Sequence, residues 1–326
     1  MRGAWLAAPA ALALAGCEGA QSWLDPRGVN ARETLDLWLL TVWVSAGVMV
    51  LVTATMLHAL FAARWRGGRR WRLLLIGGCG VALPAVVLPV FLVSSLRIEW
   101  PYAHHRPGDF VIDVVAWQFW WEVRYPHPEG GPPVVAANEI RIPVGRPVRF
   151  NLATEDVIHS FWIPALAGKV DMIPGRINSA RVLAERPGEF RGACFEFCGL
   201  QHANMAFTVH AMPAEEFEAW LRREAGPAPP PATEEARRGH ALFLQHGCGS
   251  CHAVRGHGAE GRVAPDLTRL ASRPTIGAGM LPNTRGSLAG WIAATQQIKP
   301  GANMPSFNQL SGPELHDLVS YLEGLR

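Results

Sequence analysis

Hydrophobic residues follow two very different patterns along the chain. Residues 35–63 and 73–96 are almost uninterrupted apolar runs, each long enough to cross a hydrocarbon core that needs about 20 such residues. Over residues 110–212 the pattern changes to short, often alternating runs rich in Val, Ile, Phe and Trp, separated by turn residues. The pattern therefore predicts two membrane-spanning helices followed by an all-β unit, either a sandwich or a small barrel.

The C-terminal third of the chain has helical periodicity again. Residues 214–225 are amphipathic and predict a helix that closes the all-β unit. A proline-dense stretch at 226–235 predicts a semi-extended linker, and residues 236–326 form a separate unit with helical patterns at both ends. Ser311 and Glu314 fit a capping box at the start of its last helix. Because a unit of about 90 residues has a small core, we expect a large cofactor to complete it.

The N-terminal end carries a signal for export. Residues 1–16 contain an early arginine, a short apolar run and small residues just before Cys17, which is the layout of a lipoprotein-type signal peptide. We expect Cys17 to become the lipid-modified first residue of the mature chain; an ordinary signal peptide is the alternative. Residues 17–34 are then a periplasmic segment, and residues 35–97 form the transmembrane hairpin.

Charge sets the orientation of the hairpin. Five arginines lie between the two apolar runs, so the positive-inside rule places this loop in the cytoplasm and everything after residue 97 outside. The two exported units differ in sign. Residues 97–225 contain 16 acidic and 13 basic side chains, a net charge of −3, and residues 236–326 contain 5 and 9, a net charge of +4. Opposite charges on tethered units favour docking of one unit on the other.

The segment CGSCH predicts covalently bound haem. Cys248 and Cys251 are spaced so that their thiols can add to two vinyl groups of one haem, while His252 ligates the iron. A thioredoxin-like redox pair would need a βαβ context, and a zinc site would need a second ligand pair. Met304 in GANMPSF is the expected second axial ligand, and Met280 in GAGMLPN is the other candidate. With PDLT at 265–268, these motifs resemble a class I cytochrome c.

A second cluster of soft ligands lies in CFEFCGLQHANM, residues 194–205. A disulfide between Cys194 and Cys198 leaves His202 and Met205 without a role, and a zinc site needs one more histidine. Copper explains more of the segment, because thiolate and imidazole ligands with a weak methionine recur in electron-transfer copper sites. Two bridging thiolates indicate a binuclear centre.

Together with HSFWIPALAGKVDMIPGR at residues 159–176, this segment closely resembles subunit II of the haem-copper cytochrome c oxidases. The two-helix anchor, the all-β unit and the order of segments match as well. The C-terminal unit corresponds to the cytochrome c extension of one subclass. The resemblance implies a multidomain membrane protein with a transmembrane helical hairpin, a cupredoxin-like all-β domain over 98–225 and an all-α class I cytochrome c domain over 236–326.

The metal ligands are implied by this resemblance. It implies a binuclear CuA centre bridged by two cysteines, with one histidine on each copper and with a methionine and a backbone carbonyl as weak outer ligands. The ligands are His159, Cys194, Glu196 through its carbonyl, Cys198, His202 and Met205. The resemblance also implies that the Glu196 side chain helps to bind magnesium at the boundary with subunit I.

WQFWW, residues 117–121, departs from the family pattern. Many members have tryptophan directly after the glutamine, where electrons from cytochrome c enter, and this chain has Phe119. Trp117, Trp120 and Trp121 are the other candidates for this role, and an aromatic core strand is the competing interpretation. The second apolar run also lacks the glutamate that many members place at a proton pathway, so proton uptake there would use another residue or subunit.

The combined prediction is the electron-accepting subunit of a proton-pumping terminal oxidase in the bacterial inner membrane. Cytochrome c or another respiratory donor reduces the haem, and the electron passes through CuA to a haem of subunit I, where oxygen is reduced to water. The expected partners are the oxidase subunits and membrane lipid, without nucleic acid. The alternatives are a nitric oxide reductase subunit that uses CuA and a zinc-stabilised membrane lipoprotein, against which Met205 and the haem motif argue.

Overall fold

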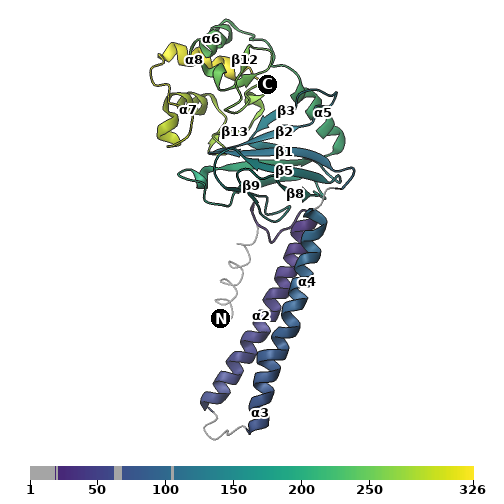
Figure 1. Ribbon diagram of the computed structural model, residues 1–326. Helices are drawn as coiled ribbons and strands as arrows, with labels where there is room; N and C mark the ends of the chain where they lie inside the picture. Colours follow the sequence, from purple (N-terminus) through teal and green to yellow (C-terminus); the bar gives the residue numbers. More distant parts are fainter. Residues whose placement is uncertain (1–18, 20, 62–67, 104–105) are drawn as a thin grey trace, which may run out of the picture.

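The computed structural model has three parts, a pair of long helices, a β sandwich and a small helical unit at the C-terminal end (Figure 1). It describes these residues: 19, 21–61, 68–103 and 106–326. The expected signal peptide at 1–16 and the expected lipid attachment at Cys17 lie outside the described residues. The hairpin, the sandwich and the helical unit predicted from the sequence are confirmed.

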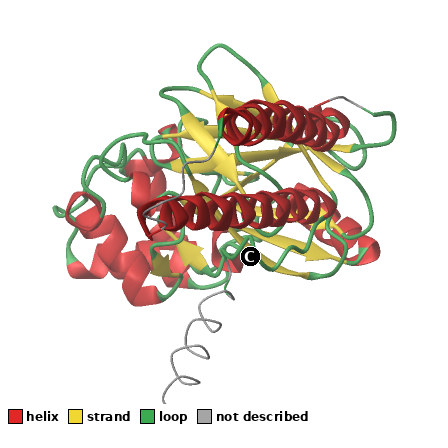
Figure 2. Cartoon of the chain, turned by 90° about the horizontal axis from the view of Figure 1, so that it is seen from below, coloured by secondary structure: helices red, strands yellow, loops and turns green. Residues whose placement is uncertain are grey.

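The two long helices run side by side and project from one end of the sandwich (Figures 1 and 2). The first is α2 (Val29–Phe61), and the second is continuous through α3 (Arg69–Leu74), the π-helical segment η1 (Leu75–Ala82) and α4 (Leu83–Ala103). Their most apolar stretches have mean hydropathies of 2.1 and 2.3. Both helices are thus long and apolar enough to cross a membrane.

Ten strands form two five-stranded sheets that pack face to face. The first has the order β3-β2-β1-β5-β8, with bounds Val134–Ala137, Trp120–Tyr125, Phe110–Trp117, Val148–Thr154 and Asn178–Val182. The second has the order β4-β10-β9-β6-β7, with bounds Glu139–Pro143, Ala206–Met212, Gly188–Cys194, His159–Trp162 and Val170–Met172. The pairs β1–β5 and β4–β10 are parallel and the other pairs are antiparallel.

Alternation along the strands creates the core between the sheets. In β5, Val148, Phe150 and Leu152 are fully buried, while Arg149 and Asn151 between them stay half-exposed. Burying each large apolar side chain contributes about 1.5–3 kcal/mol. The period of two that predicted strands in this region is therefore also what separates the inner face of the sheet from its outer face.

Aromatic residues join the sheets and hold the closing helix. Trp121 of the first sheet packs edge-on against Phe161 and Phe207 of the second, with ring centroids 5.9 and 5.0 Å apart. The helix α5 (Ala214–Ala225) has the bounds predicted from its amphipathic pattern, and it buries Phe217 and two further apolar side chains on its inner face.

The C-terminal unit is built around two helices that cross closely. Its elements are α6 (Glu234–Gln245), η3 (Cys248–Ser250), β11 (Ala253–Val254), β12 (Ala259–Glu260), η4 (Leu270–Ser272), β13 (Thr275–Ile276), β14 (Leu281–Pro282), α7 (Arg285–Ile298) and α8 (Gly312–Leu322). Gly239 lets α6 approach α8, because a Cβ there would lie 2.0 Å from the Asp317 carbonyl oxygen. The predicted capping box of Ser311 and Glu314 starts α8 and is confirmed.

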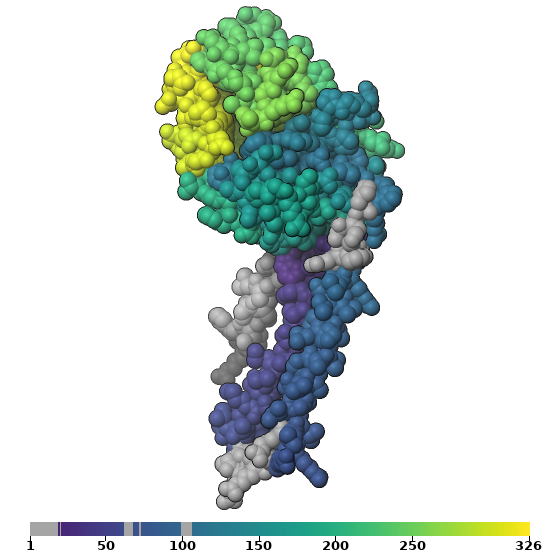
Figure 3. All heavy atoms as spheres, in the orientation of Figure 1, coloured from purple at the N-terminus to yellow at the C-terminus, as the bar shows by residue number. Residues whose placement is uncertain are grey.

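The C-terminal unit sits on the end of the sandwich that faces away from the long helices (Figures 1 and 3). Two arginines fasten it to α5: Arg255 Nη2 donates to Glu224 O and Arg269 Nη2 donates to Arg223 O, each at 2.5 Å. The C-terminal end of a helix favours such cations. Among the described residues no ion pair joins the two units. The opposite net charges had predicted docking, and the contacts that form are hydrogen bonds to backbone carbonyls.

Candidate metal and haem sites

Strand pairing brings the predicted copper ligands together. His159 is the first residue of β6 and Cys194 is the last residue of β9, and the register of these antiparallel strands pairs Phe161 with Cys194. The chain then loops back to Met205, directly before β10, and the Cys194 amide donates to the Met205 carbonyl (3.0 Å). The strand register therefore places His159, which is far from Cys194 in the sequence, beside the loop formed by residues 194–205.

The donor atoms form a compact cluster. Cys194 Sγ lies 3.8 Å from Cys198 Sγ and 3.7 Å from His159 Nδ1. Cys198 Sγ lies 3.6 Å from His202 Nδ1 and 3.9 Å from Met205 Sδ. Two bonds to one metal, about 2.3 Å to sulfur and about 2.0 Å to imidazole nitrogen, span separations of this size. The donor set therefore fits a metal centre with two thiolates, two imidazoles and an adjacent thioether.

The cluster is mostly buried, with His202 half-buried, and a hydrogen bond joins its two thiols. His159 and Met205 are fully buried, and Cys194 and Cys198 are nearly so. A hydrogen bond from the Cys198 thiol lowers the pKa of Cys194 to about 3, and the same contact raises the pKa of Cys198. Because metals bind thiolates, an incoming ion would displace the remaining proton.

Asp156 supports the cluster and was not predicted from the sequence. Its Oδ1 accepts a hydrogen bond from His159 Nε2 (2.8 Å), and its Oδ2 accepts one from the Gln118 amide (2.6 Å). Burial alone would raise the pKa of Asp156, but hydrogen bonds from His159 and from the Gln118 and Val157 amides hold it below its usual value. The carboxylate thereby turns His159 Nδ1 toward the sulfur atoms. An acidic residue three positions before the histidine was the available sequence signal.

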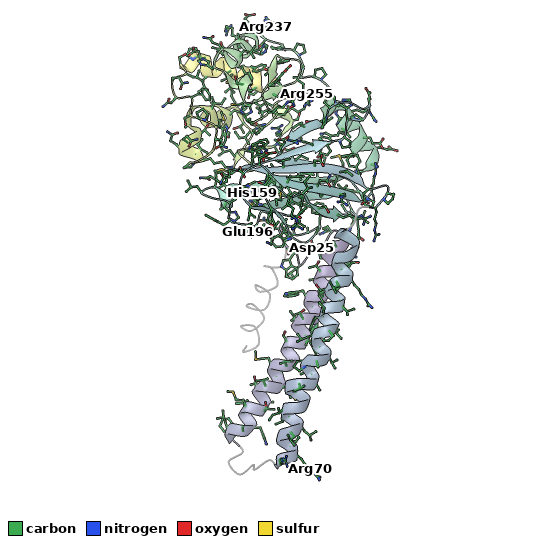
Figure 4. The ribbon with its side chains drawn as sticks, in the orientation of Figure 1. Asp25, Arg70, His159, Glu196, Arg237 and Arg255 are labelled. Carbon is green, nitrogen blue, oxygen red and sulfur yellow. The ribbon has the colours of Figure 1, made fainter. Side chains whose placement is uncertain are left out.

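Glu196 contributes two different groups. Its carbonyl oxygen lies 3.2 Å from Cys194 Sγ, inside the donor cluster. Its carboxylate is half-exposed and lies 3.8 Å from Lys169 Nζ. In Figure 4 Glu196 is on the side of His159 that faces the long helices. This arrangement agrees with a carbonyl ligand, and the role of the carboxylate in binding magnesium stays a prediction.

The four aromatic residues predicted as candidates for electron uptake lie in different surroundings. Trp117 and Trp120 stack on each other, with centroids 5.9 Å apart and ring planes 9° apart, and both are half-buried. Trp121 is fully buried and meets His159 edge-on, with centroids 6.3 Å apart. Phe119 is also buried, and its carbonyl accepts a hydrogen bond from the C-terminal unit. Trp121 is thus both a core residue and a neighbour of a predicted ligand.

In the C-terminal unit, the predicted haem motif follows α6. Cys248 starts the short helix η3, and Cys251 and His252 follow it directly. His252 Nδ1 donates to the Pro265 carbonyl at 2.7 Å, which leaves Nε2 free to bind iron. Burial lowers the pKa of His252, so the imidazole is neutral, as a metal ligand must be.

The side chain of Gln296 supports the loop that carries Met304 through two hydrogen bonds. Gln296 Nε2 donates to the carbonyls of Ala302 (2.6 Å) and Met304 (2.7 Å). The Met304 side chain packs against the core of the unit. Other partly buried apolar side chains against that core are Leu267, Leu281, Ala289, Trp291, Phe307, Leu310 and Leu315. A cysteine pair, a neutral histidine and this apolar surface fit a haem. Met280 is half-buried, and the choice between the two methionines stays a prediction.

Two protein families match successive parts of the chain. Residues 132–212 match the family described as "Cytochrome C oxidase subunit II, periplasmic domain". Residues 236–326 match the family described as "Cytochrome c". The first range contains all six predicted copper ligands, and the second contains the CGSCH segment and Met304.

Curated relatives with the name "Cytochrome c oxidase subunit 2" align with most of the chain. One from Alkalihalophilus pseudofirmus is 33% identical over 331 residues, which cover 97% of this chain and 94% of that protein. One from Bacillus subtilis is 30% identical over 263 residues, 75% of this chain and 72% of that protein. The solved periplasmic domain of cytochrome oxidase subunit II from Bradyrhizobium japonicum is 31% identical, with a TM-score of 0.33, and the match covers 36% of this chain and 95% of that domain.

Proposed function

Because the chain belongs to the cytochrome c oxidase subunit II family and ends in a cytochrome c domain, we propose that electrons enter a haem-copper oxidase through it. The observation that carries the proposal is the buried pair of thiols with one imidazole nitrogen beside each sulfur. Oxygen is reduced elsewhere in the complex, on subunit I, and this chain supplies the electrons.

The residues present would hold a binuclear CuA centre. Cys194 and Cys198 would supply its thiolate ligands, and His159 and His202 would supply its imidazole ligands. The Met205 thioether and the Glu196 carbonyl would be its weaker ligands. A mostly buried site of soft ligands would suit electron transfer, because the ligands would hold their places while the charge of the metal changes. Asp156 fixes one imidazole for the same purpose.

Cys248 and Cys251 would hold the haem through thioether bonds, and His252 and Met304 would supply its iron ligands. When bound, the haem and the copper would supply one-electron chemistry, by which this chain would pass electrons from an external donor such as cytochrome c to the haem of subunit I. The C-terminal unit, the His159 cluster and the long helices follow one another along the molecule (Figure 4), which supports this order of transfer.

The helices anchor the chain in the membrane. Two apolar helices and the family of the chain support membrane anchoring. We assign the sandwich and the cytochrome c domain to the periplasmic side of a bacterial inner membrane, with both helices spanning it. Lipidation at Cys17 would add a further anchor, and coupling of oxygen reduction to proton pumping would occur in the partner subunits.

Metal and haem analysis of the intact chain tests this function. The chain is produced in a host that attaches haem c and is purified in detergent. We expect one haem and two coppers per chain, with a mixed-valence copper signal in electron paramagnetic resonance. Cys198→Ser should abolish that signal and leave the optical spectrum of the haem unchanged.

The matched control is Cys79→Ser, a cysteine in the second long helix that lies on the exposed surface of that helix. This variant should keep both coppers. Zinc without copper in the unmodified chain, or a copper signal that survives in Cys198→Ser, would contradict the assignment.

A further inference from the structure

One buried cation lies in the contact between the two exported units, at a place that the roles assigned above leave without a function. Lys299 directly follows α7 and is only 2% exposed. Its Nζ donates to three backbone carbonyls: Gly277 (2.9 Å), Asn204 (2.8 Å) and Phe119 (3.0 Å). The first belongs to the cytochrome c domain and the other two belong to the sandwich.

An ammonium group has three donors and no acceptor, so all the hydrogen-bonding capacity of Lys299 is used in this contact. Burial lowers the pKa of Lys299 to about 8, which leaves the group mostly protonated at neutral pH. A buried charge is costly unless hydrogen bonds replace its hydration. Separating the units would remove two of the three acceptors, while the third would stay with the lysine.

The carbonyls that Lys299 binds lie next to both redox sites. Asn204 precedes the copper ligand Met205, and Phe119 follows Gln118. Gln118 Nε2 donates to the carbonyl of the copper ligand Cys198 at 2.6 Å. On the other side, Lys299 lies five residues before the axial ligand Met304.

A short chain of hydrogen bonds crosses the contact at this place. Asn303, which precedes Met304, donates through Nδ2 to the Gln118 carbonyl in a long hydrogen bond of 3.5 Å. Gln118 in turn contacts the Cys198 carbonyl. Asn303 and Gln118 therefore connect the loop of the proposed haem ligand Met304 to the loop of the proposed copper ligand Cys198.

We propose that Lys299 is a positioning residue that latches the cytochrome c domain onto the sandwich, with the Met304 loop against the Gln118–Phe119 turn. This inference rests on the proposed function, because it concerns the step in which one electron leaves reduced haem and reduces the oxidised copper centre, without proton transfer. It also bears on WQFWW: the Phe119 side chain is buried in the core of the sandwich, and its carbonyl accepts a hydrogen bond from Lys299 in the latch.

Arg255 and Arg269 do not replace the latch. They bind the carbonyl end of α5, at Arg223 and Glu224, whereas Lys299 binds beside the copper loop. Loss of Lys299 would thus leave the domain attached at α5 and weaken its hold beside the copper loop, where the remaining hydrogen bonds are single ones from Asn303, Gln201 and the Ala206 amide.

Hydrogen exchange at the Ala206 amide tests the latch without relying on either cofactor. This amide donates to the Ala278 carbonyl across the contact (3.2 Å), so its exchange reports opening of the contact. In the purified full chain, Lys299→Met should accelerate exchange at Ala206 by at least about tenfold, since buried carbonyls lose their donor. Arg262→Met, which removes a charge from an exposed position of the same domain, should leave exchange unchanged.

A disulfide cross-link provides a second test of the latch. A Cβ on Gly301 would lie 3.8 Å from Leu200 Cβ, the usual separation in a disulfide. In Lys299→Met the transfer of an electron from photoreduced haem to copper should slow, and adding Leu200→Cys with Gly301→Cys should restore it in the oxidised form only. Copper content and both spectra are measured in every variant.

Unchanged exchange at Ala206 in Lys299→Met overturns the latch, as does acceleration confined to amides inside the cytochrome c domain. Because the φ of +80° at Gly301 strains a side chain there, formation of the disulfide is first verified by mass spectrometry. Failure of the formed cross-link to restore a slowed transfer also overturns the latch. Absence of copper or haem from the unmodified chain overturns the proposed function instead, because exchange at Ala206 measures the contact whether or not the metals are bound.

Discussion

At the scale of single residues, the candidate copper site depends on side chains that hold the ligands as much as on the ligands themselves. Asp156 accepts hydrogen bonds from His159 Nε2 and from the Gln118 amide. The Gln118 side chain donates a hydrogen bond to the carbonyl of Cys198. The ligands have residue types that can be recognised in a sequence, whereas Asp156 and Gln118 act through positions that only folding brings near them.

Asp156→Asn should weaken copper binding by about 10–100-fold, because an amide orients His159 without the negative charge that strengthens the ligand. Copper retention against a competing chelator measures this. The control is Asp113→Asn, an exposed carboxylate that bonds Asn151 on the outer face of β1. Equal retention by the two variants would show that Asp156 has no part in holding the metal.

Glu139 should make stability depend on pH. Burial raises its pKa to about 7 from an ordinary 4.5, although the positive charges of Arg273 and of Arg141, which is 3.7 Å away, act in the opposite direction. Because the folded-state pKa is the higher one, the folded chain holds more protons between these values, and stability falls as pH rises from about 4.5 to 7. Glu139→Gln imitates the protonated group.

This variant should exceed the unmodified chain in stability by less than about 1 kcal/mol at pH 5 and by about 1–3 kcal/mol at pH 8. Thermal unfolding at the two pH values checks the difference. Glu129→Gln, at an exposed loop position, should change neither value. A stabilisation of equal size at pH 5 and pH 8 would exclude titration of Glu139 as the cause.

At the scale of elements, most boundaries follow from local sequence and the close contacts do not. The amphipathic pattern of 214–225 and the capping box at Ser311 predicted where α5 and α8 begin. Local rules sufficed because both signals depend on neighbours within one or two turns. The crossing of α6 and α8 depends on Gly239, and a lone glycine in a helical pattern gives no sign of what it faces.

Two glycines that look alike in sequence should therefore behave in opposite ways. Gly239→Ala places a Cβ 2.0 Å from the Asp317 carbonyl oxygen and should destabilise the C-terminal unit by more than about 2 kcal/mol. Gly290→Ala, in α7 where a Cβ would meet no atom within 4 Å, should stabilise it by about 0.5–1 kcal/mol. Thermal unfolding followed at the haem spectrum measures both; similar shifts would contradict this account of the crossing.

At the scale of the whole molecule, the cytochrome c domain is docked by buried hydrogen bonds to backbone carbonyls. Opposite net charges of the two units had suggested docking. The hydrogen bonds across the contact instead run to carbonyl oxygens, and their donors are Lys299, Arg255, Arg269, Gln201, Asn303 and the Ala206 amide. Net charge describes how two units attract at a distance, and it does not identify the groups that meet.

Docking should therefore resist salt. Between 0.15 and 1 M salt the screening length falls from about 8 to about 3 Å, which weakens exposed charge pairs and has little effect on buried bonds to carbonyls. Exchange at the Ala206 amide should change by less than about twofold over this range. A loss of protection by tenfold would show that exposed charges hold the domains together.

The sequence by itself determined the fold class and the chemistry that the chain carries. A pair of long apolar helices, a cupredoxin-like β domain and a helical cytochrome c domain were predicted and are confirmed. They could be predicted because hydrophobic periodicity and family motifs are properties of short stretches of sequence. The copper and haem ligands were also named from motifs, and their assignments stay predictions that the geometry of the cluster supports.

Only the tertiary structure decided which groups meet across long stretches of sequence. It placed Asp156 behind His159, buried Trp121 in the core, covered Phe119 and brought Lys299 against three carbonyls. Every residue has the same backbone carbonyl. The sequence therefore contains no particular residue type that would identify the partner of a lysine that binds carbonyls. The physical reason is that such contacts depend on the register and docking of whole elements, which no local pattern records.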